Sequence, residues 1–146
     1  GSMFLRALRE GLIDPKRSVQ IGIRSFSEDD YGFTVMSSPW VAENGVRATV
    51  LEIQKVIGRN KAYLTFDIDC LDPAYAPGTG TPVAGGMTSL QALTILRGLG
   101  NIDIIGMDVV EVAPAYDHSE ITAIAAATLA HDFICLKAWQ KQQRKD

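Results

Sequence analysis

Cysteine and histidine are both scarce in this chain, with two of each among 146 residues. Cys70 and Cys135 are too few for the disulfide framework of a small secreted domain, so we expect two reduced thiols in a cytoplasmic protein. His118 and His131 lack the H-x-D or E-x-x-H spacing that places two ligands on one metal ion. We expect His131 to be packed or solvated, whereas His118 could also line the mouth of a site.

The chain also lacks a strong excess of charge of one sign and a long apolar run. Lys and Arg number 14 and Asp and Glu number 17, which gives a net charge of −3 and no basic stripe for nucleic acid. No uninterrupted apolar run approaches the roughly 20 residues of a membrane span, and no signal peptide is recognisable, so no membrane partner is expected. Apolar residues make up 47% of the chain, enough for one folded domain over residues 1–146. Gly1 and Ser2 resemble the remnant of a tag.

Strand-like and helix-like segments alternate along the chain. Period-two or short apolar patterns predict strands at residues 19–24, 33–36, 62–67 and within 102–112, and helical spacing predicts helices at residues 4–12, 46–57, from 88 onward and 119–142. Residues 37–45 are expected to be a connection. This alternation predicts an α/β fold with a mostly parallel sheet, in which sites lie at the carboxyl ends of the strands.

Two carboxylates close the apolar strand at residues 62–67. Successive side chains of a strand alternate faces, so Asp67 and Asp69 are expected on the same face. Two like charges side by side are costly to bury, and a hard cation with oxygen ligands would relieve their repulsion. The alternative is that both are solvated turn residues, because aspartate is common where a strand enters a loop.

A second acid ends the next strand. Glu111 follows the apolar residues of the 102–112 segment, so it is expected at the same sheet edge as Asp67 and Asp69. A carboxylate there could belong to a functional site, or it could be an exposed strand-end acid. Asp108 lies three residues earlier and should face the opposite way, which indicates a supporting or structural role.

Three long motifs carry a resemblance to a known family. They are DIDCLDPAYAPGTGTPVAGG at residues 67–86, GMDVVEVAPAYD at 106–117 and SEITAIAAATLA at 119–130. Together they resemble the C-terminal half of a ureohydrolase of the arginase and agmatinase family, closest to the agmatinases. The resemblance implies part of a three-layer αβα arginase-like fold and a homo-oligomeric enzyme. It also implies hydrolysis of a guanidino compound, most simply agmatine to putrescine and urea in polyamine biosynthesis.

The resemblance also implies a role for each candidate residue. Asp67 and Asp69 match ligands of a centre of two Mn²⁺ ions, one of them bridging both ions. Glu111 matches the residue that holds the guanidinium of the substrate, and a carboxylate can take that planar cation bidentately. Thr81 matches a residue near the substrate, although it could equally be a turn threonine. Gly78 and Gly86 are expected to allow backbone turns rather than chemistry.

Several parts of the family's site have no counterpart in this sequence. The resemblance implies an Asp-x-His-x-Asp strand and a further histidine, both upstream of residue 3. Without them the chain supplies two of six metal ligands, so by itself it is expected to be inactive. The alternatives are a guanidinobutyrase or arginase-like enzyme for a different guanidino substrate, or a non-catalytic α/β module.

The missing strand has a structural consequence. In the family's sheet it lies between the strands that match residues 63–67 and 19–24. We therefore expect these two strands either to pair directly or to have the space between them filled by another polypeptide, because unpaired strand edges and exposed apolar faces favour association.

Overall fold

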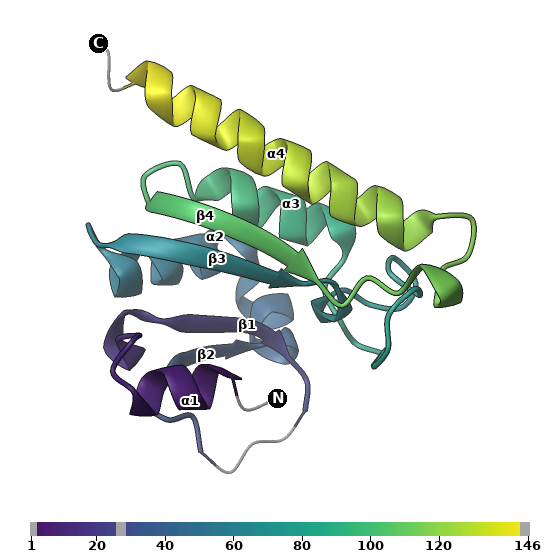
Figure 1. Ribbon diagram of the computed structural model, residues 1–146, viewed down its shortest axis with the longest axis horizontal. Helices are drawn as coiled ribbons and strands as arrows, with labels where there is room; N and C mark the ends of the chain where they lie inside the picture. The colour runs from purple at the N-terminus through teal and green to yellow at the C-terminus, as the bar shows by residue number, and fades with distance from the viewer. Residues whose placement is uncertain (1–2, 26–28, 144–146) are drawn as a thin grey trace.

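The computed structural model describes residues 3–25 and 29–143, so the interpretation of Gly1 and Ser2 lies outside the described residues. Helices and strands alternate along the chain (Figure 1). The elements are α1 (Met3–Arg9), β1 (Val19–Ile23), β2 (Thr34–Ser37), α2 (Ser38–Ile57), β3 (Lys61–Asp67), α3 (Ser89–Gly98), β4 (Asp103–Val110) and α4 (Ile121–Gln143), with single 3-10 turns η1 (Pro15–Arg17), η2 (Ile68–Cys70) and η3 (Pro114–Tyr116).

The described strands form two parallel pairs. β1 pairs with β2, and β3 pairs with β4 in a register that sets Asp67 opposite Val110. The predicted α/β class with parallel strands is confirmed. β1 and β3 are not hydrogen-bonded to each other, so of the two alternatives expected for these strands the described structure does not show direct pairing.

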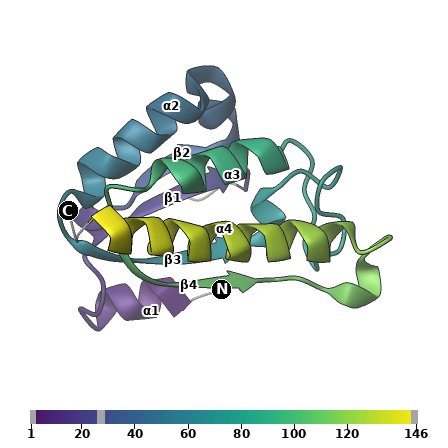
Figure 2. The same ribbon diagram turned by 90° about the horizontal axis from the view of Figure 1, so that it is seen from above.

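Three helices lie along one side of the strands. α2 packs on β1, β2 and α3, and α3 and α4 pack on each other, with α4 beside β4 (Figures 1 and 2). Apolar side chains from these helices and from the strands they cover form one core, which includes Ile53, Ile68, Ile104 and Leu129. α1 lies on the opposite side of the strands from α2 (Figure 2).

The strands keep apolar surface that the described helices do not cover. Tyr63 on β3 is 59% exposed and Ile105 on β4 is 63% exposed, and Val35 on β2 and Val110 on β4 are exposed too. Exposed large apolar side chains on a parallel sheet indicate a face that another layer covers, because parallel sheets are ordinarily buried on both sides.

α2 begins eight residues earlier than the sequence pattern predicted. Ser37 caps the helix by accepting a hydrogen bond from the N–H of Trp40, and Pro39 occupies its first turn. Residues 37–45 were expected to be a connection, but Ser37 ends β2 and the helix runs from Ser38 through a kink at Gly45, where φ is +79°. The error came from the missing apolar periodicity before the kink, although a serine followed by a proline is a recognised start signal.

α3 begins as predicted. The Thr88-x-x-Gln91 pattern predicts a capping box, and the structure has it, because each side chain accepts a hydrogen bond from the backbone N–H of the other residue. The spacing of Leu90, Leu93 and Leu96 predicts the apolar face of this helix. Leu96 is buried, together with Ala92 and Ile95, whereas Leu90 is 67% exposed.

α4 is held at its beginning by Asp117, whose carboxylate accepts hydrogen bonds from the backbone N–H groups of Thr122 and Ala123.

By length and composition α4 could also cross a membrane, with a mean hydropathy of 1.4. Its polar residues interrupt the apolar sequence, so α4 does not stand out as a continuous apolar run. One such helix is weak grounds for membrane insertion. Here Leu129 and Leu136 of α4 belong to the core, and Gln140 bonds the carbonyls of Gly100 and Ile102.

Candidate active site

The candidate metal carboxylates lie where β3 passes into the turn η2. Asp67 is the last residue of β3, and its Oδ1 accepts a hydrogen bond of 3.1 Å from the backbone N–H of Asp69. Asp69 therefore belongs to a 3-10 turn and not to the strand. The alternation of strand side chains, from which we predicted a shared face, is not the reason that these two residues lie close together.

Thr81 contacts one of these carboxylates directly. Its hydroxyl donates a hydrogen bond of 2.8 Å to Oδ2 of Asp69, across twelve residues of the glycine-rich loop. Thr81 was predicted to lie near a substrate, and in this structure its hydroxyl orients Asp69. A carboxylate whose second oxygen is held in this way has a restricted orientation, which a metal ligand requires.

Glu111 follows the end of β4 and has a left-handed backbone, with φ of +65°. Non-glycine residues rarely adopt this conformation, and it turns the chain sharply out of the strand. The carboxylate is exposed, and its Oε2 would lie 3.9 Å from a Cβ built on Gly80. Glu111 is thus beside the same loop that carries Thr81.

The electrostatics of Asp67 show that the three acids share one environment. Burial raises the pKa of Asp67 to about 6, while the hydrogen bond from the N–H of Asp69 lowers it. The negative charges of Asp69 and Glu111 raise the pKa of Asp67 further. The negative charges of Asp69 and Glu111 thus act on Asp67, and a cation beside Asp67 would relieve this repulsion.

The loop over residues 72–86 is fixed by backbone contacts. Oδ2 of Asp72 accepts hydrogen bonds from the N–H groups of Gly85 and Gly86, at 2.8 and 3.3 Å. Gly86 passes so close to Leu71 that an added Cβ would lie 2.4 Å from the carbonyl carbon of Leu71. In the middle of the loop, Gly78 leaves no room for a Cβ beside Asp117. The prediction that these glycines serve the backbone agrees with these contacts.

Asp108 lies apart from the three acids. Its Oδ2 accepts a hydrogen bond of 3.1 Å from the hydroxyl of Tyr63 across the β3–β4 pair. This contact fits the predicted structural role. His118 is exposed in the segment between Glu111 and α4, where its backbone N–H donates to Oδ1 of Asp117.

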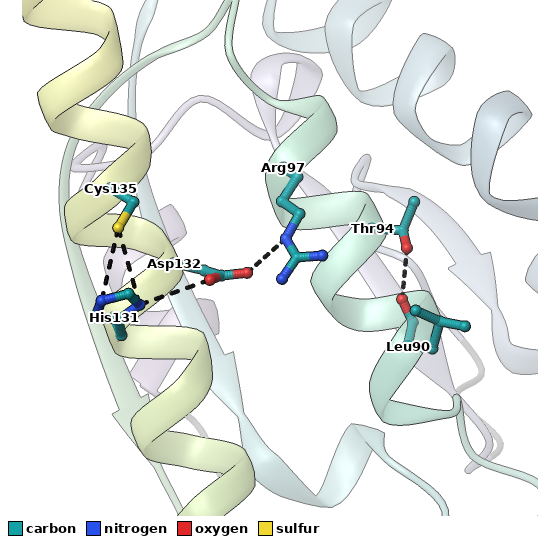
Figure 3. A network of polar contacts seen from close by, with 6 residues as sticks. All are labelled: Leu90, Thr94, Arg97, His131, Asp132 and Cys135. Atoms are coloured by element: carbon teal, nitrogen blue, oxygen red, sulfur yellow. Dashed lines mark hydrogen bonds and ion pairs between the residues drawn. The ribbon is translucent and has the colours of Figure 1, made fainter.

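His131 belongs to a separate polar cluster between α3 and α4 (Figure 3). Its ring lies 3.8 Å from the thiol of Cys135 and 3.8 Å from Oδ1 of Asp132, whose Oδ2 accepts a 2.7 Å hydrogen bond from Arg97. The ring is 73% exposed, so of the two states expected for His131 the structure shows the solvated one.

The two cysteines are expected to differ sharply in reactivity. Burial raises the pKa of the Cys70 thiol to about 12, and the charges of Asp67 and Asp69 raise it further, whereas Cys135 is exposed. Since the thiolate is the reactive form, iodoacetamide at pH 8 should modify Cys70 at least about 10²-fold more slowly than Cys135. Peptide mass spectrometry of the native chain measures both rates, and denatured chain, in which both thiols react, is the control. Equal native rates would contradict the burial of Cys70.

Two residues outside the predicted site residues organise this site. Asp72 makes a local Asx turn with the N–H of Ala74, a turn that the Asp-Pro pair indicates in the sequence. Arg24 bonds the carbonyls of Asp69 and Val83, which lie 45 and 59 residues away. No local pattern can predict contacts over that distance.

Comparison with known proteins supports the relationship that the motifs suggested. The arginase family matches residues 1–135. An agmatinase of Chromobacterium violaceum is 63% identical over 136 residues, covering 93% of this chain and 42% of its own length, and an agmatinase of Edwardsiella ictaluri is 58% identical over 141 residues, covering 97% and 46%. The chain belongs to the arginase family.

Solved structures give the same result. A hypothetical agmatinase from Burkholderia thailandensis superimposes with a TM-score of 0.93 and 60% identity, over 97% of this chain and 44% of that one. Proclavaminate amidino hydrolase from Streptomyces clavuligerus gives a TM-score of 0.86 at 38% identity, over 91% and 47%. The predicted arginase-like fold is confirmed, and the chain spans a little under half the length of its relatives.

The residues present fit part of a metal centre. Asp67 and Asp69 offer carboxylate oxygens, the ligands that hard divalent cations prefer. Within residues 3–25 and 29–143, no three His, Cys, Asp or Glu side chains are arranged to hold an ion together. The described residues therefore supply some of the ligands for such an ion and not a whole set.

Proposed function

We propose that this chain forms the C-terminal half of the active site of an agmatinase, which hydrolyses agmatine to putrescine and urea in polyamine biosynthesis. The observation that carries the proposal is the convergence of Asp67, Asp69 and Glu111 at the strand ends of a chain about 60% identical to agmatinases. The part of these relatives that this chain does not cover, more than half of their length, would supply the remainder of the site.

Asp67 and Asp69 would contribute ligands to two Mn²⁺ ions, which when bound supply a hydroxide nucleophile near neutral pH. Thr81 keeps Asp69 in orientation through its hydroxyl. Glu111 binds the guanidinium of the substrate with its exposed carboxylate, and this contact orients the guanidinium carbon for attack. The family membership and the oxygen donors support this assignment.

The runner-up is a related enzyme for another guanidino compound. Proclavaminate amidino hydrolase and the arginase of Bacillus caldovelox, at TM-scores of 0.86 and 0.77, share the fold of this chain. Glu111 would hold the guanidinium in each case, so the distal end of the substrate must decide between them. The greater identity to agmatinases, 57–63% among the relatives compared, favours an amine at that end.

We further propose that the enzyme is a homo-oligomer that works in the cytoplasm. Uncovered apolar side chains on β3 and β4 support association, and the two unpaired thiols, Cys70 and Cys135, fit a reducing compartment. The small guanidino substrate, and neither nucleic acid nor a membrane, is the proposed partner. By itself the chain is proposed to be inactive, because it brings only two of the expected ligands.

The test uses a complete agmatinase polypeptide in which this chain forms the C-terminal half, called the complete polypeptide below. With Mn²⁺, urea release from agmatine should exceed that from arginine or 4-guanidinobutyrate by at least about 10²-fold in kcat/KM. A chelator should abolish the activity and added Mn²⁺ restore it. A preference for arginine or guanidinobutyrate would favour the runner-up, and no urea from any substrate would refute a ureohydrolase.

A further inference from the structure

Arg24 joins three segments of the chain at the edge of the candidate site. It follows the last residue of β1, and its guanidinium donates to three backbone carbonyls. Nη1 bonds Gly22 at 3.1 Å, and Nη2 bonds Asp69 at 2.6 Å and Val83 at 2.8 Å. One side chain thus holds the end of β1, the turn η2 and the glycine-rich loop together.

Two of these carbonyls flank the contact between Thr81 and Asp69. The first belongs to Asp69 itself, and the second belongs to Val83, two residues after Thr81. The hydroxyl of Thr81 donates to Oδ2 of Asp69 at 2.8 Å. Because Arg24 fixes the backbone on both sides of that hydrogen bond, it sets the separation across which the carboxylate of Asp69 is oriented.

The hydrogen bonds of Arg24 connect two parts of the fold that no strand pairing connects. β1 and β3 are not hydrogen-bonded to each other, so no ladder aligns the end of β1 with the turn that follows β3. The guanidinium makes that connection with charge-assisted hydrogen bonds, which are stronger than those between neutral groups.

We propose that Arg24 is a positioning residue that holds Asp69 and the Thr81 loop in the geometry needed to bind the metal ion. This inference rests on the proposed function, in which Asp69 is a metal ligand. In this proposal Arg24 contacts neither the ion nor the substrate, and it acts through its hydrogen bonds to the backbone carbonyls of Asp69 and Val83. The planar fork of arginine reaches two carbonyls at once, which the single ammonium of lysine does not do with the same geometry.

The test compares variants of the complete polypeptide by manganese affinity and by activity. Arg24→Ala should weaken Mn²⁺ binding by about 10- to 100-fold, measured by equilibrium dialysis, the range found when groups that orient metal ligands are removed. Arg24→Lys keeps the charge and is expected to lose nearly as much. At saturating Mn²⁺ both variants should regain most of the wild-type kcat, because the residue acts on the ligand and not on the substrate.

Arg17→Ala is the matched control. Arg17 also donates to a distant backbone carbonyl at 3.1 Å, but that carbonyl belongs to Val56 of α2 and not to the turn η2 or the glycine-rich loop. It should leave Mn²⁺ affinity within about twofold of wild type. An equal loss in Arg17→Ala, wild-type affinity in Arg24→Ala, or full rescue by Arg24→Lys would each overturn the positioning role.

The proposed function can fail separately from this inference. If the wild-type polypeptide released no urea but bound Mn²⁺, the dialysis comparison would still decide the role of Arg24. If Arg24→Ala did not fold, Arg24→Lys and Arg24→Gln would replace it, since both keep a long polar side chain. In that comparison a loss of Mn²⁺ affinity by both variants supports the proposal, and wild-type affinity in either one overturns it.

Discussion

Replacing Glu111 with glutamine in the complete polypeptide is expected to lower kcat/KM for agmatine hydrolysis by about 10²- to 10³-fold and to leave manganese content unchanged. Glutamine keeps the size of the side chain but removes the charge that would hold the guanidinium. Truncating one partner of a close ion pair costs several kcal/mol in the bound state, which corresponds to this range of rates.

The geometry supports this separation between substrate and metal. Asp67 and Asp69 belong to β3 and the turn that follows it, whereas Glu111 follows β4 and turns out of the strand with φ of +65°. Its carboxylate lies beside Gly80, on the loop side of the site, and is exposed. An exposed carboxylate on a separate strand end can bind a substrate cation without being needed to hold an ion.

Glu120→Gln provides the matched control for this experiment. Glu120 is also exposed and also has a left-handed backbone, with φ of +59°, but it lies at the beginning of α4. Its substitution should change kcat/KM by less than about twofold. Loss of manganese from Glu111→Gln, measured by metal analysis, would identify Glu111 as a ligand and contradict its assignment to the substrate.

Much of the fold could be predicted from local patterns. The capping box of Thr88 and Gln91, the position of β3 and the strand that precedes Glu111 all follow from periodicity and turn chemistry, and the structure has them. The beginning of α2 at Ser38 was missed because the apolar spacing starts only after the kink at Gly45. Local rules succeed where one period continues through an element, and they fail where the period is interrupted.

The candidate site was predictable in its residues but not in its geometry. The spacing of Asp67 and Asp69 predicted that the two carboxylates lie close together, yet a turn and not strand alternation brings them close. Thr81 was chosen as a residue near the substrate, and the structure shows it bonded to Asp69. The role of Arg24 depends on carbonyls in two distant loops, so only the three-dimensional fold could reveal it.

The second large expected effect is a change in assembly and activity when this chain binds the N-terminal half of an agmatinase. β1 pairs only with β2 and β3 only with β4 in the described structure, so each has a second edge whose backbone groups form no ladder. Tyr63 and Ile105 add exposed apolar surface to β3 and β4. The TM-score of 0.93 to an agmatinase that is more than twice as long shows that these strands keep the positions they have in the larger fold.

We therefore expect the isolated chain to self-associate and to release no urea, because open strand edges favour association and the ligand set is partial. Co-expression with the N-terminal half of the Chromobacterium violaceum agmatinase should give a defined complex with manganese-dependent urea release. Sedimentation velocity measures the assembly, and a urea assay measures the activity.

A complex that carries Asp67→Asn with Asp69→Asn should still assemble but release no urea, which separates assembly from chemistry. A monomeric isolated chain that unfolds cooperatively and does not bind the N-terminal half would contradict the prediction that another polypeptide fills the space between β1 and β3.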